Sequence, residues 1–168
     1  MPTIFTQGWG TNAQHYALDF YKSTTAVAHD EAVIGPALNI RGLGNVQDIL
    51  IFIKAKASGA VGSDKLLNWF AAGSVDGGTT YTGALTADQA DIATFSANLV
   101  AYPNVIFGRP VAMQDTSQQN GGPFSLAALF GGVLPEYVLI GIHNRANVAL
   151  TGNNTDNDVL YQVVYTQA

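Results

Sequence analysis

The chain has 168 residues, of which 48% are hydrophobic and only 11% are charged, with a net charge of −5 and no cysteine. A typical soluble domain is about 25% charged, so this surface is short of charge. The missing cysteines exclude a disulfide framework and a thiolate metal site. Apolar runs such as 49–53 are too short to cross a membrane, and the scattered basic residues form no cluster that would bind nucleic acid.

The length fits one domain with its own core. A surface with little charge keeps neighbouring molecules apart only weakly, which suits a protein that is packed against others in an assembly. No signal-peptide pattern follows Met1, and we expect synthesis in the cytoplasm. Because the apolar runs are too short to span a membrane, we expect no membrane partner.

Beta-strand patterns dominate the chain. Weak strands are expected over 16–22 and 32–40, and Pro36 makes the second an edge strand or a broken one. The segment 46–57 indicates a long strand whose centre is apolar on both faces, as in a strand covered by a layer on each side. After a turn at 58–64, a second long strand covers 66–75. Later strands are expected over 96–101, 105–113, 124–130, 137–144 and 159–166.

Turn and capping signals separate these strands. Asp76-Gly77-Gly78-Thr79 supplies the positive φ that a tight turn needs. Thr86-Ala87-Asp88-Gln89 resembles a capping box and predicts a short helix over 87–93. The whole pattern predicts an all-β chain, an antiparallel β-sandwich of jelly-roll-like form, with one short helix and a single domain over 16–168.

Residues 1–15 form a separate unit in the sequence, which we interpret as an extended N-terminal arm. Trp9 lies between two glycines, and tryptophan is a common anchor at interfaces. The arm docks on a partner or neighbouring subunit, or else Trp9 packs over the open end of the sandwich; the sequence favours neither.

No constellation of catalytic residues is evident. The three histidines, His15, His29 and His143, show no metal-ligand spacing, and hydrolase, phosphate-loop and dinucleotide motifs are missing. His143, beside Asn144 and Arg145, could act as a base, but an ordinary histidine at a strand end is the favoured interpretation. We therefore expect no enzyme activity, no catalytic residue and no cofactor.

The segment 151–158 (Thr-Gly-Asn-Asn-Thr-Asp-Asn-Asp) is rich in oxygen ligands that suit calcium. It lacks the spacing of a calcium loop and a terminal glutamate, and Asn and Asp are also standard turn residues. A hairpin loop is the favoured interpretation, a cation site between Asn153 and Asp158 stays open, and no metal is predicted.

Three segments are informative together. They are the turn at 74–81 (Ser-Val-Asp-Gly-Gly-Thr-Thr-Tyr), the strand at 135–144 (Pro-Glu-Tyr, an apolar run, His-Asn), and the turn at 149–153 (Ala-Leu-Thr-Gly-Asn) before a closing Tyr-rich strand. In this combination the chain, over roughly 46–168, resembles small virion proteins of tailed bacteriophages, in particular capsid decoration, or cement, proteins.

The resemblance implies a structural protein on the outer face of the phage head, often a homotrimer, that clamps adjacent subunits of the major capsid protein. It implies no catalytic residue and a location in the virion after synthesis in the bacterial host. The candidate interface residues that we select are Phe5, Trp9, Tyr81, Arg109, His143 and Arg145.

Two alternatives stay open. The first is a carbohydrate- or receptor-binding β-sandwich module of a phage tail or fibre, which needs an exposed row of aromatic rings such as Trp69, Tyr81 and Tyr102. The second, less favoured, is a β-sandwich or cupin enzyme. A cupin would need clustered His and Glu ligands, and the chain has only two glutamates, Glu31 and Glu136.

Overall fold

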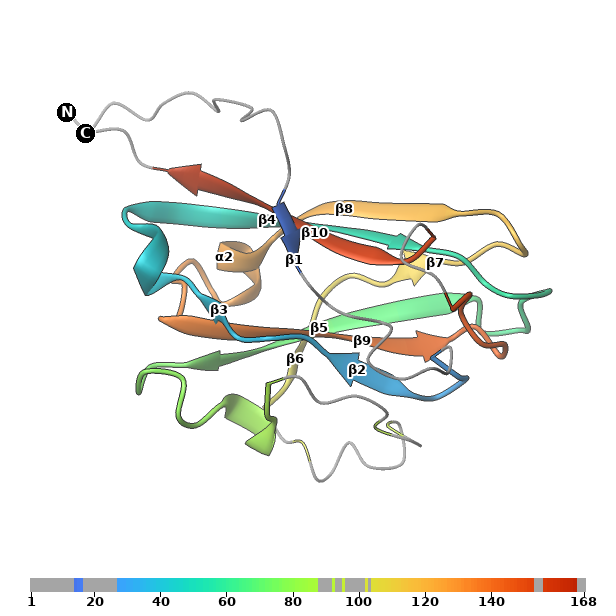
Figure 1. Ribbon diagram of the computed structural model, residues 1–168, viewed down its shortest axis with the longest axis horizontal. Coiled ribbons are helices and arrows are strands. Elements are labelled where there is room, and N and C mark those ends of the chain that lie inside the picture. The colour runs from blue at the N-terminus through green and yellow to red at the C-terminus, as the bar shows by residue number, and fades with distance from the viewer. Residues whose placement is uncertain are drawn as a thin grey trace.

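The computed structural model describes residues 14–16, 27–87, 92, 95, 102, 104–152 and 156–165, and their strands form two antiparallel sheets packed against each other (Figure 1). Sheet A has the order β1 (Gln14–Tyr16), β10 (Asp158–Tyr165), β4 (Val46–Ala55), β8 (Gln119–Ser125). Sheet B has the order β2 (Ala32–Ile34), β9 (Tyr137–Arg145), β5 (Leu66–Ser74), β6 (Ile106–Phe107).

Several short elements complete the described part of the chain. β3 (Leu38–Asn39) pairs with β9, and β7 (Val111–Ala112) pairs with β5. The two 3-10 turns are η1 (Arg41–Leu43) and η2 (Thr82–Ala84), and the short α-helix is α2 (Leu126–Leu129). The predicted all-β sandwich with a short helix is confirmed.

The strand order is that of a jelly roll. Sheet A has the order β1-β10-β4-β8, and sheet B has the order β2-β9-β5-β6. Successive parts of the chain therefore cross repeatedly between the two sheets, as in the double Greek key of that architecture. This fold occurs in capsid proteins, lectins and cupins alike, so it does not select a function by itself.

The main core lies between the sheets. Alternate residues of β4 and β9 point into it, and Ile49, Ile51 and Ile53 are at most 1% exposed. Trp69 of β5 is also buried there, stacked on Phe124 with the ring centroids 5.4 Å apart. This alternation is the pattern that a strand with one buried face requires.

A second apolar cluster covers the outer face of sheet B. Phe70 and Leu139 point away from the main core, yet each is only 1% exposed, because Leu85, Ile92 and Phe95 pack on them. The ring centroids of Phe70 and Phe95 are 5.0 Å apart. We call the described residues 81–87, 92, 95, 102 and 104–107 the outer layer, and its 3-10 turn η2 (yellow-green in Figure 1) lies beyond sheet B.

Strand bounds match the sequence prediction where apolar periodicity is strong. The strands expected over 46–57, 66–75, 137–144 and 159–166 appear as β4, β5, β9 and β10 within two residues at each end. The expected strands 32–40 and 105–113 are each interrupted. The first is broken around Pro36, and the second leaves the sheet between Phe107 and Val111.

The prediction of a strand over 124–130 is wrong. This segment contains the end of β8 and the helix α2. Ser125 caps this helix, since its Oγ accepts a hydrogen bond from the N–H of Ala128 at 2.9 Å,. β8 begins at Gln119, in a polar Gly-rich stretch without a strand pattern.

Some predictions fall on residues outside the described ones. These are the strand at 96–101, most of the strand at 16–22, the arm up to residue 13 with Phe5 and Trp9, and most of the helix at 87–93. Ile92, inside the expected helix, is described, and it forms an antiparallel bridge with Ala32.

Candidate functional site

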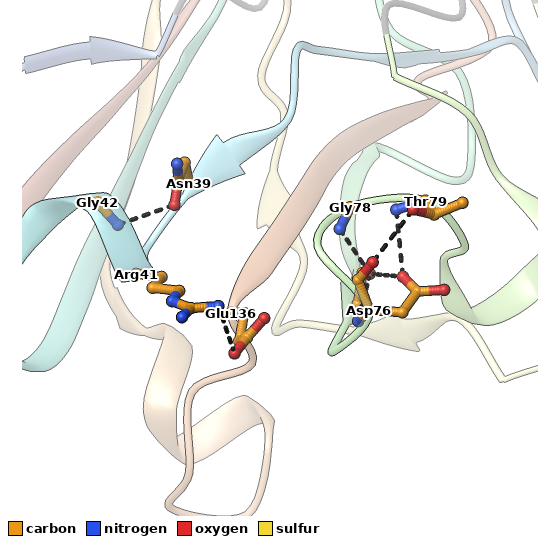
Figure 2. A network of polar contacts seen from close by, with 8 residues as sticks. Asn39, Arg41, Gly42, Asp76, Gly78, Thr79 and Glu136 are labelled. Atoms are coloured by element: carbon orange, nitrogen blue, oxygen red, sulfur yellow. Dashed lines mark hydrogen bonds and ion pairs between the residues drawn. The ribbon is translucent and has the colours of Figure 1, made fainter.

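Three loops meet at the end of the sandwich where β5 ends and β9 begins. The residues Ser74 and Tyr137 are paired there, and Asn39 of β3 pairs with Tyr137 on the other side. We call this region the loop end and define it as residues 39–46, 74–81 and 130–137, together with Tyr165, which pairs with Val46. Figure 2 shows two of its loops on either side of the start of β9.

Asp76 organises the first loop. Its carboxylate accepts a hydrogen bond from the N–H of Thr79 at 3.1 Å (Figure 2). It also accepts from the Ser74 hydroxyl at 2.6 Å and from the N–H of Thr80 at 3.0 Å. The Thr80 hydroxyl donates a further bond to the same side chain. These bonds, led by that from Ser74, hold the pKa of the Asp76 carboxyl well below its ordinary value. The carboxylate stays ionised and fixes the turn while Val75 projects from it.

The second loop is tied to the start of β9. The backbone N–H groups of Ile40 and Arg41 both donate to the carbonyl oxygen of Glu136, at 2.9 and 3.2 Å. The Arg41 guanidinium lies 3.5 Å from the Glu136 carboxylate, and Asn39 accepts from the N–H of Gly42 at 2.8 Å (Figure 2). The Arg41–Glu136 ion pair is exposed and adds little stability by itself. The backbone hydrogen bonds to the Glu136 carbonyl oxygen are therefore what hold this loop beside the start of β9.

The third loop follows α2. Gly131 and Gly132 have φ values of +74° and +98°, which an L side chain rarely adopts,. Their N–H groups bond back to the carbonyls of Ala128 and Ala127 at 3.2 and 2.8 Å. This glycine ending reverses the chain sharply after the helix and presents Val133 to solvent.

A shallow hollow of about 410 Å³ lies between the second and third loops. Its apolar lining comes from Ile40, Val46, Val133, Leu134 and Pro135, and its polar lining includes the Arg41–Glu136 pair. The hollow thus combines apolar groups with a balanced pair of charges.

The three most exposed large apolar side chains of the described residues all lie at the loop end. Val75 is 80% exposed, Val133 is 75% exposed and Tyr165 is 50% exposed. The next two, Phe107 and Leu66, are 40% and 37% exposed and lie elsewhere on sheet B. Exposed apolar groups that gather on rigid loops are typical of a docking surface.

Among the sequence-predicted interface residues with described side chains, Tyr81 belongs to the loop end. It is half-buried against the buried cluster of the outer layer, and burial, followed by Tyr137 and Asp76, raises the pKa of its phenol. Arg109 is exposed in the loop between β6 and β7, where its carbonyl accepts a hydrogen bond from Trp69 Nε1 at 3.0 Å. The structure does not bring Arg109 to the loop end.

His143 and Arg145 lie at the opposite end of β9, so they do not share a surface with Tyr81. His143 is 1% exposed, which excludes it as a ready interface residue, and its Nε2 lies 2.8 Å from Asp30 Oδ1. Its ring centroid is 5.0 Å from that of Phe95. Burial lowers the pKa of His143, and the hydrogen bond with Asp30 opposes that shift. Arg145 is half-buried and pairs with Asp64 at 2.7 Å.

The aromatic row needed for carbohydrate binding is not formed by the three rings suggested from the sequence. Trp69 is 1% exposed and lies in the main core. Tyr81 and Tyr102 both pack against the outer layer's buried cluster, with Tyr102 stacked on Phe95 at 5.5 Å. The expectation of an exposed Trp69 is therefore wrong, because a buried indole cannot act as a stacking platform for a sugar.

Other sequence candidates for chemistry are separated in space. Glu31 and Glu136 lie at opposite ends of β9, since Glu31 is bonded to Asn144 and Glu136 precedes Tyr137. Within the described residues, no group of three or more His, Asp or Glu side chains could hold a metal ion. No helix in that part of the chain is long and apolar enough to cross a membrane.

The loop at 151–158 is closed at its base. The Asn157 amide donates to the Thr151 carbonyl and hydroxyl at 2.6 and 2.8 Å, and its oxygen accepts from the N–H of Lys56 at 2.8 Å. Asp156 lies 3.6 Å from Lys56 Nζ. Residues 153–155, which carry the rest of the cation hypothesis, lie outside the described residues.

Comparisons with protein families, curated proteins and solved structures found no match to this chain. Its function has to be inferred from its own residues and geometry.

Sequence reasoning found the turn at Asp76 but missed the other parts of the loop end. Val133 follows the pair Gly131-Gly132, and an apolar residue directly after a glycine reversal is the signal that could have revealed it. Tyr165 lies within the strand predicted over 159–166, and its exposure arises because it is the last residue of β10.

Proposed function

We propose that this protein is a structural virion protein that docks on the outside of a tailed-phage head through its loop end and cements adjacent subunits of the major capsid protein. The role has no catalytic step. The observation that carries the proposal is that Val75, Val133 and Tyr165, the most exposed large apolar side chains described, all lie at one end of the sandwich.

The fixed geometry of the loops supports docking. Asp76 holds Val75 in place through bonds within its own turn, and the glycine ending after α2 holds Val133. A surface that is already ordered loses little conformational entropy on binding. Full burial of a valine side chain contributes about 1.5–3 kcal/mol, so two such anchors are enough to matter for affinity.

The shortage of charge supports the same role. Burying an unpaired ion in an interface is costly, and the loop end carries its charges as an ion pair (Arg41–Glu136) and a carboxylate satisfied by its own loop (Asp76),. A protein that binds the assembled shell better than free subunits stabilises the shell by mass action. The resemblance to decoration proteins noted from the sequence agrees with this role.

The test uses phage heads purified without this protein and measures binding of the full chain by co-sedimentation. We expect the double variant Val75→Ser with Val133→Ser to bind at least about tenfold more weakly, which corresponds to a loss of about 1.4 kcal/mol. Both side chains are exposed, so the melting temperature should change little.

Leu66→Ser is the matched control, because it removes a partly exposed apolar side chain at the far end of β5. Its binding should equal that of the unmodified chain. Equal binding by the double variant and the unmodified chain would remove the loop end from the docking surface. No binding of the unmodified chain to heads would refute the cement role.

A further inference from the structure

The two sheets differ in what covers their outer faces. On sheet B the outward side chains Phe70 and Leu139 are buried under the outer layer and are each 1% exposed. On sheet A the outward residues Leu50, Phe52, Leu160 and Val164 are all half-buried, and they belong to neither buried cluster of the described residues.

The outward residues of β4 and β10 form four cross-strand pairs. From one end of the face to the other, the pairs are Asp48 with Val164, Leu50 with Gln162, Phe52 with Leu160, and Lys54 with Asp158. The centre of the face is therefore largely apolar and its two ends are charged. An apolar centre with a polar rim is the ordinary anatomy of a protein interface.

Along β4 the two charges are placed so that this row complements itself, while Asp158 of β10 lies beside Lys54 in the same copy. Asp48 is at one end of the outward row, Lys54 is at the other, and Leu50 and Phe52 lie between them. Consider a second copy packed face to face with the first. The two copies are related by a two-fold axis that lies between the two faces, runs perpendicular to the strands and passes between Leu50 and Phe52. Asp48 of each copy then faces Lys54 of the other, and Leu50 faces Phe52. A two-fold interface requires this kind of self-complementarity.

The face is of modest size. Its strands have 3, 8, 10 and 7 residues, which at about 3.3 Å per residue and about 4.8 Å between strands gives an area on the order of 440 Å². Two such faces bury about 900 Å² together, just below the size of a stable interface, so we expect a weak pair that forms at high protein concentration. Two sheets that pack face to face in this way bring their side chains into contact at a spacing of about 10 Å.

We propose that two copies of this chain pair through the outer faces of sheet A across a two-fold axis, with Leu50 and Phe52 at the centre and Asp48 of each copy beside Lys54 of the other. The pair does not rest on the capsid role, and it leaves the loop end free. The partner that covers this sheet is then a second copy of the same chain.

Light scattering on the full chain after size-exclusion chromatography tests the pairing. We expect a mass of about twice 17.7 kDa, and Phe52→Asp should give a folded monomer. Val75→Ser, at the loop end, is the matched control and should remain a dimer. A monomer in the unmodified chain at about 100 μM, or a mass of three chains as the resemblance implies, would overturn the proposal.

A charge-exchange experiment tests the two-fold arrangement itself. Lys54→Glu and Asp48→Lys should each weaken the homodimer by about tenfold, because each puts like charges opposite each other. An equimolar mixture of these two variants should recover the affinity, since both charge contacts are then attractive in the mixed pair. Asp48 also accepts a hydrogen bond from the N–H of Ala127 at 2.8 Å, so the fold of each variant is checked by circular dichroism. Lack of recovery by folded variants would contradict this geometry.

Discussion

At the residue scale, single polar side chains in this protein each bind several backbone groups. Asp76 binds the N–H groups of its own loop, and Asn144 donates to the carbonyls of Val27, Ala28 and Val148. Buried polar groups need such partners. A chain so short of charged residues therefore fixes its turns with single amides and carboxylates, and the apolar tips of the turns remain exposed.

His143 gives the residue-scale prediction. Its pKa is lowered in the folded protein, mainly by burial, so the unfolded chain binds a proton that the folded chain excludes. The contribution of His143 to stability is therefore complete well above the ordinary pKa of 6.5 and falls as the pH drops through that value,. The free energy of unfolding should decrease between pH 8 and pH 5.

The matched variant is His143→Gln, which keeps a polar group near Asp30 and does not titrate. Urea unfolding at each pH should show a weaker dependence on pH for this variant than for the unmodified chain. Parallel curves for the two proteins would show that His143 is not the group responsible.

At the element scale, the outer layer is as much a part of the fold as the two sheets. Phe95 is fully buried and contacts the rings of Phe70, Tyr102 and His143. The turn at Asp30 holds this layer in place, because the Asp30 carbonyl accepts from the N–H of Phe95 at 2.8 Å. The layer therefore closes the face of sheet B that would otherwise be apolar and open.

Phe95→Ala should lower the free energy of unfolding by about 3–5 kcal/mol, the range for a large buried aromatic replaced by alanine. Phe107→Ala is the control, because Phe107 contacts the rings of Phe70 and Phe95 but is 40% exposed. Its loss should be clearly smaller when both are measured by chemical unfolding. Equal losses would mean that the outer layer is not packed as described.

The long strands could be predicted from sequence because burial imposes a period of two. β4, β5, β9 and β10 have continuous or alternating apolar patterns, and their bounds were close to those predicted. β8 could not be predicted, since Gln119-Asn120-Gly121-Gly122-Pro123 has little strand preference and pairs only because β4 lies beside it,. Of the loop end, only the turn at Asp76 could be predicted from sequence, because a turn depends on the residues within it. The meeting of three loops depends on the tertiary fold.

At the scale of the whole molecule, the two ends and two outer faces of the sandwich differ. The loop end carries the most exposed apolar side chains, and the opposite end carries the paired and buried polar groups His143, Arg145 and Asn157. One outer face is sealed by the outer layer and the other presents a self-complementary row. A protein with separate surfaces for a shell and for a second copy can link neighbouring subunits of that shell.

The most direct measurement of the central claim is the composition of purified phage particles, with heads and tails separated and proteins quantified by mass spectrometry. The cement role predicts that this protein is found on heads, in a near-integer ratio to the major capsid protein. Its absence from heads, or its presence only in tails, would contradict the account.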